Sequence, residues 1–251
     1  MFLTIDLTEQ TVTYSQPTMS TTSKPPGYDE KSEQYFQLTR QEMMDFIPKT
    51  CKTMLDVGCG SGGFGQTLKR SRTIEIWGVE PVAAAAALAA TRLDHVIESP
   101  FVSELPFPPR SFDCIVFNDV LEHLIDPAAT LKLANKFLSP TGCIVASIPN
   151  VRHFPTMWAL FFRKEWIYRD CGILDSTHLR FFTRKSIEPL FKSAGFYVER
   201  IEGINSYISS KPRTAPRWRY FVFLNCLTFG FFGDMRYLQY AVVARPNRPE
   251  A

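Results

Sequence analysis

The sequence predicts an α/β fold in which helices cover both faces of a mostly parallel sheet. Short apolar runs that resemble buried strands alternate with helix-forming segments along most of the chain. Glycines at alternating positions follow one of these runs, as in the tight strand-to-helix turns of such sheets. The length of 251 residues suits one domain of this class with additions.

An N-terminal arm is expected to precede the regular part of the chain. Residues 1–27 end in a stretch rich in Ser, Thr and Pro, and we interpret them as an arm and linker. Residues 28–251 form the predicted domain. Its strands are expected at residues 53–57, 74–79, 112–117, 143–148, 196–202 and 238–244. Its helices are expected at residues 30–46, 64–70, 82–91, 127–138 and 183–194.

Three further stretches are not assigned to helices or strands. Residues 140–142, Pro-Thr-Gly, are expected to form a turn before the strand at 143–148. Residues 151–180 and 206–234 are long insertions rich in aromatic residues and Arg. Insertions of this kind build the lids and substrate walls of a fixed scaffold. We therefore predict that both are caps over a binding site.

Composition indicates in which compartment the protein works and which partners it does not bind. The net charge of +3 is small and its Lys and Arg residues are mostly dispersed, which argues against a nucleic-acid partner. The six cysteines form no CxxC pair, which is typical of a reducing compartment without disulfides or structural metal. The chain start lacks the pattern of a signal peptide, and no run reaches the roughly 20 apolar residues of a membrane span. We expect a cytoplasmic protein.

The turn after the strand at 53–57 has the spacing of a cofactor-binding loop. Gly58, Gly60 and Gly62 let the backbone turn tightly and approach a ligand without Cβ interference. The helix behind them presents unpaired N–H groups, which suit a polar ligand. Glu80 closes the next strand, where an acid can bind ribose hydroxyls. By itself this pattern is compatible with a dinucleotide or with S-adenosyl-L-methionine.

Four motifs in order decide between these ligands. The segment 55–62, LDVGCGSG, resembles motif I of class I S-adenosylmethionine-dependent methyltransferases. The resemblance continues through VEP at 79–81, LPFP and SFD within 105–113, and NDVLEHL at 118–124. It covers about residues 28–201 and implies a Rossmann-like, doubly wound sheet of seven strands. That sheet is mostly parallel with an antiparallel last strand, and helical and aromatic cap insertions are added to it.

The resemblance also implies which residues bind the cofactor. The implied set is Asp56, Gly58, Cys59, Gly60, Gly62, Glu80, Pro81, Asn118, Asp119 and Arg40. Asp56 corresponds to the family's Asp near the amino-acid end of the cofactor, and Arg40 to a position that meets its carboxylate. Arg40 could also be a solvated helix residue. The chain departs from the family before LPFP, where an acid usually binds adenine; here Glu98 or Ser99 would serve.

Methyl transfer to a hydroxyl needs a base, and two histidines are candidates, one of them with an orienting Asp. The run 172–183, GILDSTHLRFFT, resembles a signature of bacterial methyltransferases associated with sugar and polysaccharide modification. Within it His178 is the predicted general base and Asp175 its orienting partner. The alternative is that both residues tie the insertion to the sheet by hydrogen bonds. His153, directly after a strand, is a further candidate and could equally be structural.

The motif at 118–124 could bind a divalent cation or could be purely structural. Asp119, Glu122 and His123 would lie on one side of a helical turn, and ubiquinone-type O-methyltransferases with a similar pattern can hold a cation there. The alternative is that Glu122 complements a helix dipole and His123 packs over the cofactor. We prefer this second interpretation and predict no metal.

A basic and aromatic stretch at 211–232 allows three interpretations. Its cations are Lys211, Arg213, Arg217 and Arg219. They could contact an anionic membrane or a diphosphate in a lipid-linked substrate. The third interpretation is a pocket wall with buried aromatics and solvated charges.

The predicted function is S-adenosylmethionine-dependent O-methylation of a small-molecule acceptor. The first hypothesis for this acceptor is a sugar or glycan precursor. This acceptor class follows from the resemblance alone. The second hypothesis is methylation of a quinone-like phenol or another small metabolite. A catalytically inactive cofactor-binding regulatory protein and a nicotinamide dehydrogenase are the remaining alternatives.

Overall fold

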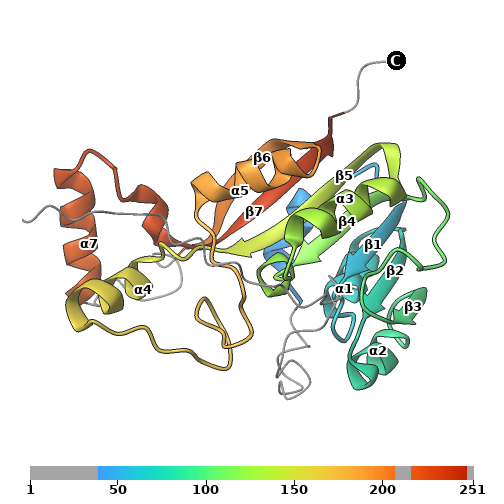
Figure 1. Ribbon diagram of the computed structural model, residues 1–251, viewed down its shortest axis with the longest axis horizontal. Coiled ribbons are helices and arrows are strands. Elements are labelled where there is room, and N and C mark those ends of the chain that lie inside the picture. Colours follow the sequence, from blue (N-terminus) through green and yellow to red (C-terminus); the bar gives the residue numbers. More distant parts are fainter. Residues whose placement is uncertain (1–38, 207–215, 248–251) are drawn as a thin grey trace, which may run out of the picture.

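The computed structural model describes residues 39–206 and 216–247, and its centre is a seven-stranded sheet (Figure 1). The strands are β1 (Thr53–Val57), β2 (Glu75–Glu80), β3 (His95–Glu98), β4 (Phe112–Asn118), β5 (Leu138–Pro149), β6 (Phe196–Ser206) and β7 (Tyr237–Pro246). Their order is β3-β2-β1-β4-β5-β7-β6. β7 pairs antiparallel with β5 and β6, whereas the pairs among β1 to β5 are parallel. The predicted mostly parallel sheet with an antiparallel last strand is confirmed.

Helices lie on both faces of this sheet. They are η3 (Gln41–Phe46), α1 (Gly63–Ser71), α2 (Ala83–Ala89), η4 (Leu121–His123), α3 (Pro127–Phe137) and α5 (Arg184–Ser193). Apolar side chains of α3 and α5 form one core with one face of the strands, and those of η3 and α1 form a second core with the other. Strand residues alternate between the two cores, as Met54 and Leu55 do, because successive side chains point to opposite faces.

Local sequence signals explain where the helices begin. The side chain of Asp126 accepts a hydrogen bond from the Ala129 amide at 2.9 Å, and Pro127 occupies the first turn of α3. α5 begins with a capping box in which Thr183 and Ser186 exchange hydrogen bonds. Gly195 follows α5 at a φ of 85°, where glycine has no steric penalty.

Three elements differ from the sequence-based expectation. The strand β3 was not predicted, since four residues with polar ends carry no strand pattern. β5 runs through the predicted turn at 140–142, and its pairing with β4 shifts register there. Of the predicted helix at 30–46, the described part is the 3-10 helix η3. The N-terminal arm predicted at 1–27 lies outside the described residues.

The helical parts of the two insertions pack against each other. The first contains α4 (Phe154–Trp158) and a short π-helix, η5 (Ala159–Arg163); the second contains α7 (Pro216–Leu227), followed by η6 (Gly233–Arg236). Phe154, Phe221 and Met235 form a small core between them, and Figure 1 shows α4 beside α7 at one end of the molecule. Within the described part of the chain, no helix is long and apolar enough to cross a membrane.

Candidate active site

The glycine loop lies at the carboxyl edge of the sheet, directly after β1. Gly58, Gly60 and Gly62 have φ values of 68°, 54° and 75°, a region in which other residues are strained. The Gly58 amide donates to the carbonyl of Val79 at 2.8 Å, which joins the loop to the end of β2. A Cβ on Gly58 would come within 2.8 Å of the Val120 side chain, so the close approach itself requires glycine.

Glu80 holds the glycine loop from the end of β2. Its side chain is fully buried, and its two oxygens accept hydrogen bonds from the amides of Gly60 and Val82, each at 2.9 Å. Pro81 lies between Glu80 and the start of α2. Backbone amides bonded to a carboxylate form strong, directional contacts. Glu80 therefore fixes the loop geometry, and its contact with a ribose stays a prediction.

Asp56 and Cys59 are buried beside Glu80. Burial first, and then the charge of Glu80, raise the pKa of Asp56 to about 7. Burial and the same two carboxylates raise the pKa of the Cys59 thiol. A cationic group of a bound ligand at this place would stabilise the ionised carboxylates. S-adenosylmethionine carries such groups at its amino-acid end, near which the resemblance places Asp56.

The strand pairing bears on the adenine contact, which stays a prediction. Glu98 pairs with Glu80 in the sheet, so the two acids end neighbouring strands at the same edge. Glu98 therefore lies at the edge where an adenine contact would be made.

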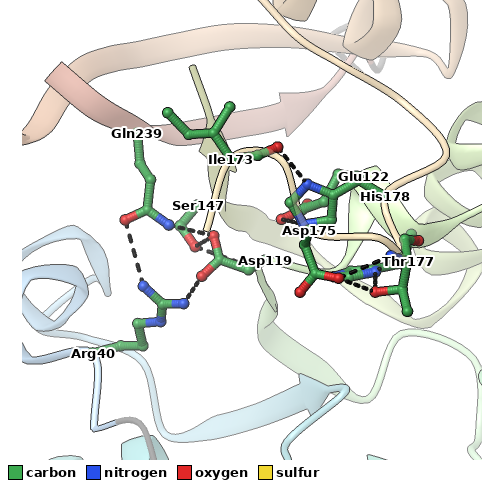
Figure 2. A network of polar contacts seen from close by, with 10 residues as sticks. Arg40, Asp119, Glu122, Ser147, Ile173, Asp175, Thr177, His178 and Gln239 are labelled. Carbon is green, nitrogen blue, oxygen red and sulfur yellow. Dashed lines mark hydrogen bonds and ion pairs between the residues drawn. The ribbon is translucent and has the colours of Figure 1, made fainter. Parts of the chain in front are cut away.

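Arg40 and Asp119 lie together at the same edge, in a network shown in Figure 2. The two side chains form an ion pair, and the Arg40 guanidinium also donates to Gln239 at 3.4 Å. The Asp119 carboxylate accepts from Ser147 at 3.0 Å and from Gln239 at 2.5 Å. Asp119 has a φ of 53°, which is unusual for a residue with a side chain.

Asn118, at the end of β4, has a buried side-chain amide. Neither its oxygen nor its nitrogen has a hydrogen-bond partner among the described residues. A buried amide without partners is costly, so a ligand that satisfies it would be stabilised. This fits the expectation that Asn118 contacts the cofactor.

A second group of polar side chains lies beside this edge and contains Glu122, His123 and His178. All three residues are buried, and one ligand atom from each lies within 4.8 Å of the others. The two imidazole rings have centroids 4.6 Å apart and are nearly perpendicular. Nε2 of His178 is 3.9 Å from a carboxylate oxygen of Glu122. Burial raises the pKa of Glu122 to about 8.

The predicted base His178 and its predicted partner Asp175 contact different groups. Nδ1 of His178 lies 2.9 Å from the carbonyl oxygen of Ile173 (Figure 2). The Asp175 carboxylate accepts from the hydroxyl and the amide of Thr177, at 2.7 Å and 2.8 Å. Thr177 in turn meets Nδ1 of His123 through its hydroxyl and its carbonyl. Asp175 thus reaches His123 through Thr177, while the backbone orients His178.

The segment around His178 is attached to the sheet edge by its backbone. The amides of Leu179 and Arg180 donate to the carbonyl of Glu122 at 2.8 Å and 3.0 Å. The Arg180 guanidinium donates to the carbonyl of Ile125 at 2.6 Å. The same segment therefore ties the insertion down and brings His178 to Glu122.

The remaining sequence-based candidates lie elsewhere. His153 is buried at the start of α4, and its amide donates to the carbonyl of Asn150 at 3.0 Å. Lys211 and Arg213 of the basic stretch lie outside the described residues, and so do the side chains of Arg217 and Arg219.

Thr177, Ser147 and Gln239 belong to these networks and were not singled out from the sequence. Thr177 lies inside the noted DSTH run. Gln239 is a polar residue within an apolar strand, which was the signal available for it.

The fold and this edge define a class of protein: an α/β domain with the cofactor loop and strand order of class I methyltransferases. A family model described as a methyltransferase domain matches residues 28–201. The chain belongs to this methyltransferase domain family. The cofactor of the domain is accordingly S-adenosyl-L-methionine.

Individual relatives share a low sequence identity with this chain. A protein named ubiquinone biosynthesis O-methyltransferase from Hydrogenovibrio crunogenus is 24% identical over 61% of this chain and 66% of its own length. A probable S-adenosylmethionine-dependent methyltransferase of Mycolicibacterium smegmatis is 28% identical over 71% of this chain and 65% of its own. The matches thus span slightly less than two thirds of these relatives. A crystal structure of a methyltransferase from Archaeoglobus fulgidus has the same fold, with a TM-score of 0.61 at 19% identity over 87% of this chain and 96% of its own.

Proposed function

We propose that the protein transfers a methyl group from S-adenosyl-L-methionine to a hydroxyl of a small acceptor, and that this acceptor is a sugar or glycan precursor. The observation that supports hydroxyl methylation is the buried group of Glu122, His123 and His178. Glu122 and His123 follow β4, which pairs with β1, the strand before the glycine loop, and backbone hydrogen bonds from Leu179 and Arg180 bring His178 to them. The support for a sugar is the resemblance of residues 172–183 to sugar-modifying methyltransferases.

The chemistry asks little of the protein beyond alignment and proton removal. The sulfonium already activates the methyl carbon, so the chain must hold the nucleophile in line and exclude water. A hydroxyl must also lose its proton during transfer. We propose that His178 takes part in this step, with the Ile173 carbonyl at Nδ1 in place of the expected Asp175. His153 remains a weaker proposal, since it lies at the start of α4.

A quinone-like phenol is the second candidate acceptor. The relative from Hydrogenovibrio crunogenus is named for methylation in ubiquinone biosynthesis, and the cap of this chain carries many aromatic side chains. A flat acceptor stacks well on such side chains. The sugar and phenol hypotheses therefore differ only in the acceptor. Both use the same cofactor and the same reaction site at the carboxyl edge of the sheet.

The test begins with the purified protein. Calorimetry should show binding of S-adenosylmethionine and none of NADH. Release of S-adenosylhomocysteine should then require an acceptor from a panel of nucleotide sugars, lipid-linked sugars and catechol-type phenols. Turnover with a sugar supports the first candidate, and turnover with phenols alone overturns it. Cofactor binding without transfer to any cell fraction would favour the inactive regulatory protein.

Mass spectrometry of cells with and without the gene identifies the product independently. A methyl group missing from a glycan or its precursor is the expected result. Loss of a methyl group from a quinone, with unchanged glycans, would establish the second candidate.

We also propose that the cap formed by α4 and α7 contacts a lipid-linked acceptor or an anionic membrane. Its apolar side chains include Phe161, Phe223, Phe229 and Phe231, which are largely exposed. Between residues 207 and 233 the sequence has four cations and no acid. Exposed aromatics beside cations are the combination that binds an anionic lipid surface.

A further inference from the structure

Gln239 is a buried polar residue of β7 whose carboxamide lies between two charged side chains. Its exposed fraction is 5%. Its Nε2 donates to the Asp119 carboxylate at 2.5 Å, and its Oε1 accepts from the Arg40 guanidinium at 3.4 Å (Figure 2). An ionised carboxylate only accepts and a guanidinium only donates, so these two charges fix the orientation of the amide. Gln239 is therefore bonded to both members of the Arg40–Asp119 ion pair.

Separate parts of the chain hold this network together. Ser147 of β5 donates to Asp119 at 3.0 Å, and Asn205 of β6 donates to Oε1 of Gln239 at 2.9 Å. Six described residues other than glycine have a positive φ, and three of them, Arg40, Asp119 and Asn205, belong to this network. A backbone in this region persists where surrounding contacts hold it, and it is concentrated at ligand-binding sites. The network therefore has the features of a built site.

The network lies beside the glycine loop. Asp119 directly precedes Val120, and a Cβ on Gly58 would come within 2.8 Å of the Val120 side chain. Arg40 thus places a cation next to the loop, where the amino-acid end of S-adenosylmethionine is expected. That end carries a carboxylate, and a guanidinium binds a carboxylate best when its plane is fixed in the matching direction. The orientation of the Arg40 guanidinium should therefore affect the affinity for the cofactor.

We propose that Gln239 is a positioning residue for the cofactor, which orients the Arg40 guanidinium toward the carboxylate of S-adenosylmethionine. Asp119 also attracts Arg40, and Gln239 bonds to each of them and so limits how closely the ion pair can close on itself. A Glu at this position would lack the donor and repel Asp119, and a Met would lack both hydrogen-bonding groups. The inference deepens the proposed function and rests on it only for the expected contact of Arg40 with the cofactor.

The experiment compares two ligands that differ only in the carboxylate. Calorimetry measures the affinities for S-adenosylmethionine and for decarboxylated S-adenosylmethionine, which keeps the adenosine, the sulfonium and the amino group. Gln239→Met preserves the length of the side chain and removes both of its hydrogen bonds. We expect this variant to bind S-adenosylmethionine about 10-fold more weakly and the decarboxylated compound within about 2-fold of the wild type. Gln239→Glu should lose at least as much affinity for S-adenosylmethionine, because a second carboxylate would hold Arg40.

Tyr240→Phe is the matched control. Tyr240 is the next residue of β7, and its side chain points to the opposite face of the sheet, into the core that contains α3 and α5. Its hydroxyl is buried and has no hydrogen-bond partner among the described residues. Removal of this hydroxyl should leave both affinities unchanged.

Asn205→Gly tests the network from an exposed position. Glycine adopts the φ of 53° without strain, so this variant should fold even if Gln239→Met does not. It removes one donor to Gln239. We expect it to bind S-adenosylmethionine about 3-fold more weakly, with an unchanged affinity for the decarboxylated compound.

A selective loss of affinity for S-adenosylmethionine supports the positioning role. Equal losses for the two ligands, or no loss in Gln239→Met, would overturn it, since damage to the fold affects both ligands alike. If Gln239→Met does not fold, the same criteria apply to Asn205→Gly. Cofactor binding and methyl transfer stand in either case. If the selective loss is found but no acceptor is methylated, the proposed function fails and the positioning role of Gln239 remains.

Discussion

Glu80 is the residue on which the cofactor loop depends most directly. Its carboxylate accepts from the amides of Gly60 and Val82, and replacement by Gln keeps the size but removes the charge. Hydrogen bonds to charged groups contribute about 1.5–3 kcal/mol. We expect Glu80→Gln to weaken S-adenosylmethionine binding by roughly 10–100-fold in calorimetry. Glu75→Gln, at the exposed start of the same strand, is the control and should bind normally.

Asp56 predicts a pH dependence of stability in the protein without ligand. Its folded-state pKa is about 7 against an ordinary 3.8, because burial and Glu80 disfavour the charged form. The folded state therefore binds more protons than the unfolded state between these values. Its stabilising contribution is present below pH 3.8 and is lost as the pH rises through 7.

Asp56→Asn removes this dependence. Its melting temperature should exceed that of the wild type at pH 8 by roughly 2–4 °C for each kcal/mol gained, with a smaller difference at pH 5. Asp45→Asn, at an exposed position of η3, should follow the wild type at both values. The interpretation is wrong if Asp56→Asn has the same pH profile as the wild type.

The sequence predicted which residues gather at this edge of the sheet better than it predicted which of them contact one another. Asp56, Glu80 and the glycines follow from local spacing, since one strand and one turn place them. The meeting of His178 with Glu122 does not, because no local spacing relates an insertion to a strand end. It depends on backbone hydrogen bonds from Leu179 and Arg180 to Glu122.

The turn after β1 combines a backbone requirement with a packing requirement. Gly58 has a φ of 68°, and an added Cβ would lie 2.8 Å from the Val120 side chain. The backbone conformation costs other residues about 1–2 kcal/mol, and overpacking adds roughly 1–3 kcal/mol. We expect Gly58→Ala to lower the free energy of unfolding by the sum of the backbone cost and the overpacking cost. The same substitution should weaken cofactor binding.

Gly172→Ala separates the two contributions. Gly172 has a similar φ of 87°, but a Cβ there would meet nothing within 4 Å. Denaturant unfolding should therefore show only the backbone cost for this variant. Combining Gly58→Ala with Val120→Ala should recover part of the loss. A loss in Gly58→Ala no greater than in Gly172→Ala would contradict the packing contribution.

Elements were predictable where hydrophobic pattern and capping agree. α3 has Asp126 and Pro127 at its start, and it was found within one residue. β3 was missed because pairing with β2 alone creates it, and its residues have no apolar run. β5 was predicted too short, since Pro140 and Gly142 indicate a turn, while the sheet extends the strand through them. Tertiary pairing overrides local preference in both cases.

The whole molecule has two parts with different surfaces. The sheet and its helices bury their apolar residues in two cores, whereas the cap has a small core of Phe154, Phe221 and Met235. Large apolar side chains remain exposed on this cap, and Phe229 is 102% exposed. Figure 1 shows α7 at the end of the molecule farthest from β3. Apolar side chains so exposed mark an interaction surface.

The cap surface predicts salt-sensitive binding to anionic vesicles. In flotation, the wild type should rise with phosphatidylglycerol vesicles at low salt and less at high salt, because the cations at 211–219 are screened. Phe229 and Phe231 are 102% and 70% exposed, and burying a phenylalanine contributes about 1.5–3 kcal/mol. The double variant Phe229→Ser/Phe231→Ser should therefore bind at least about 10-fold more weakly. Tyr197→Ser, at a 48% exposed position of β6, is the matched control and should float like the wild type. Equal flotation of the double variant and the wild type would show that Phe229 and Phe231 do not contribute to binding a lipid surface.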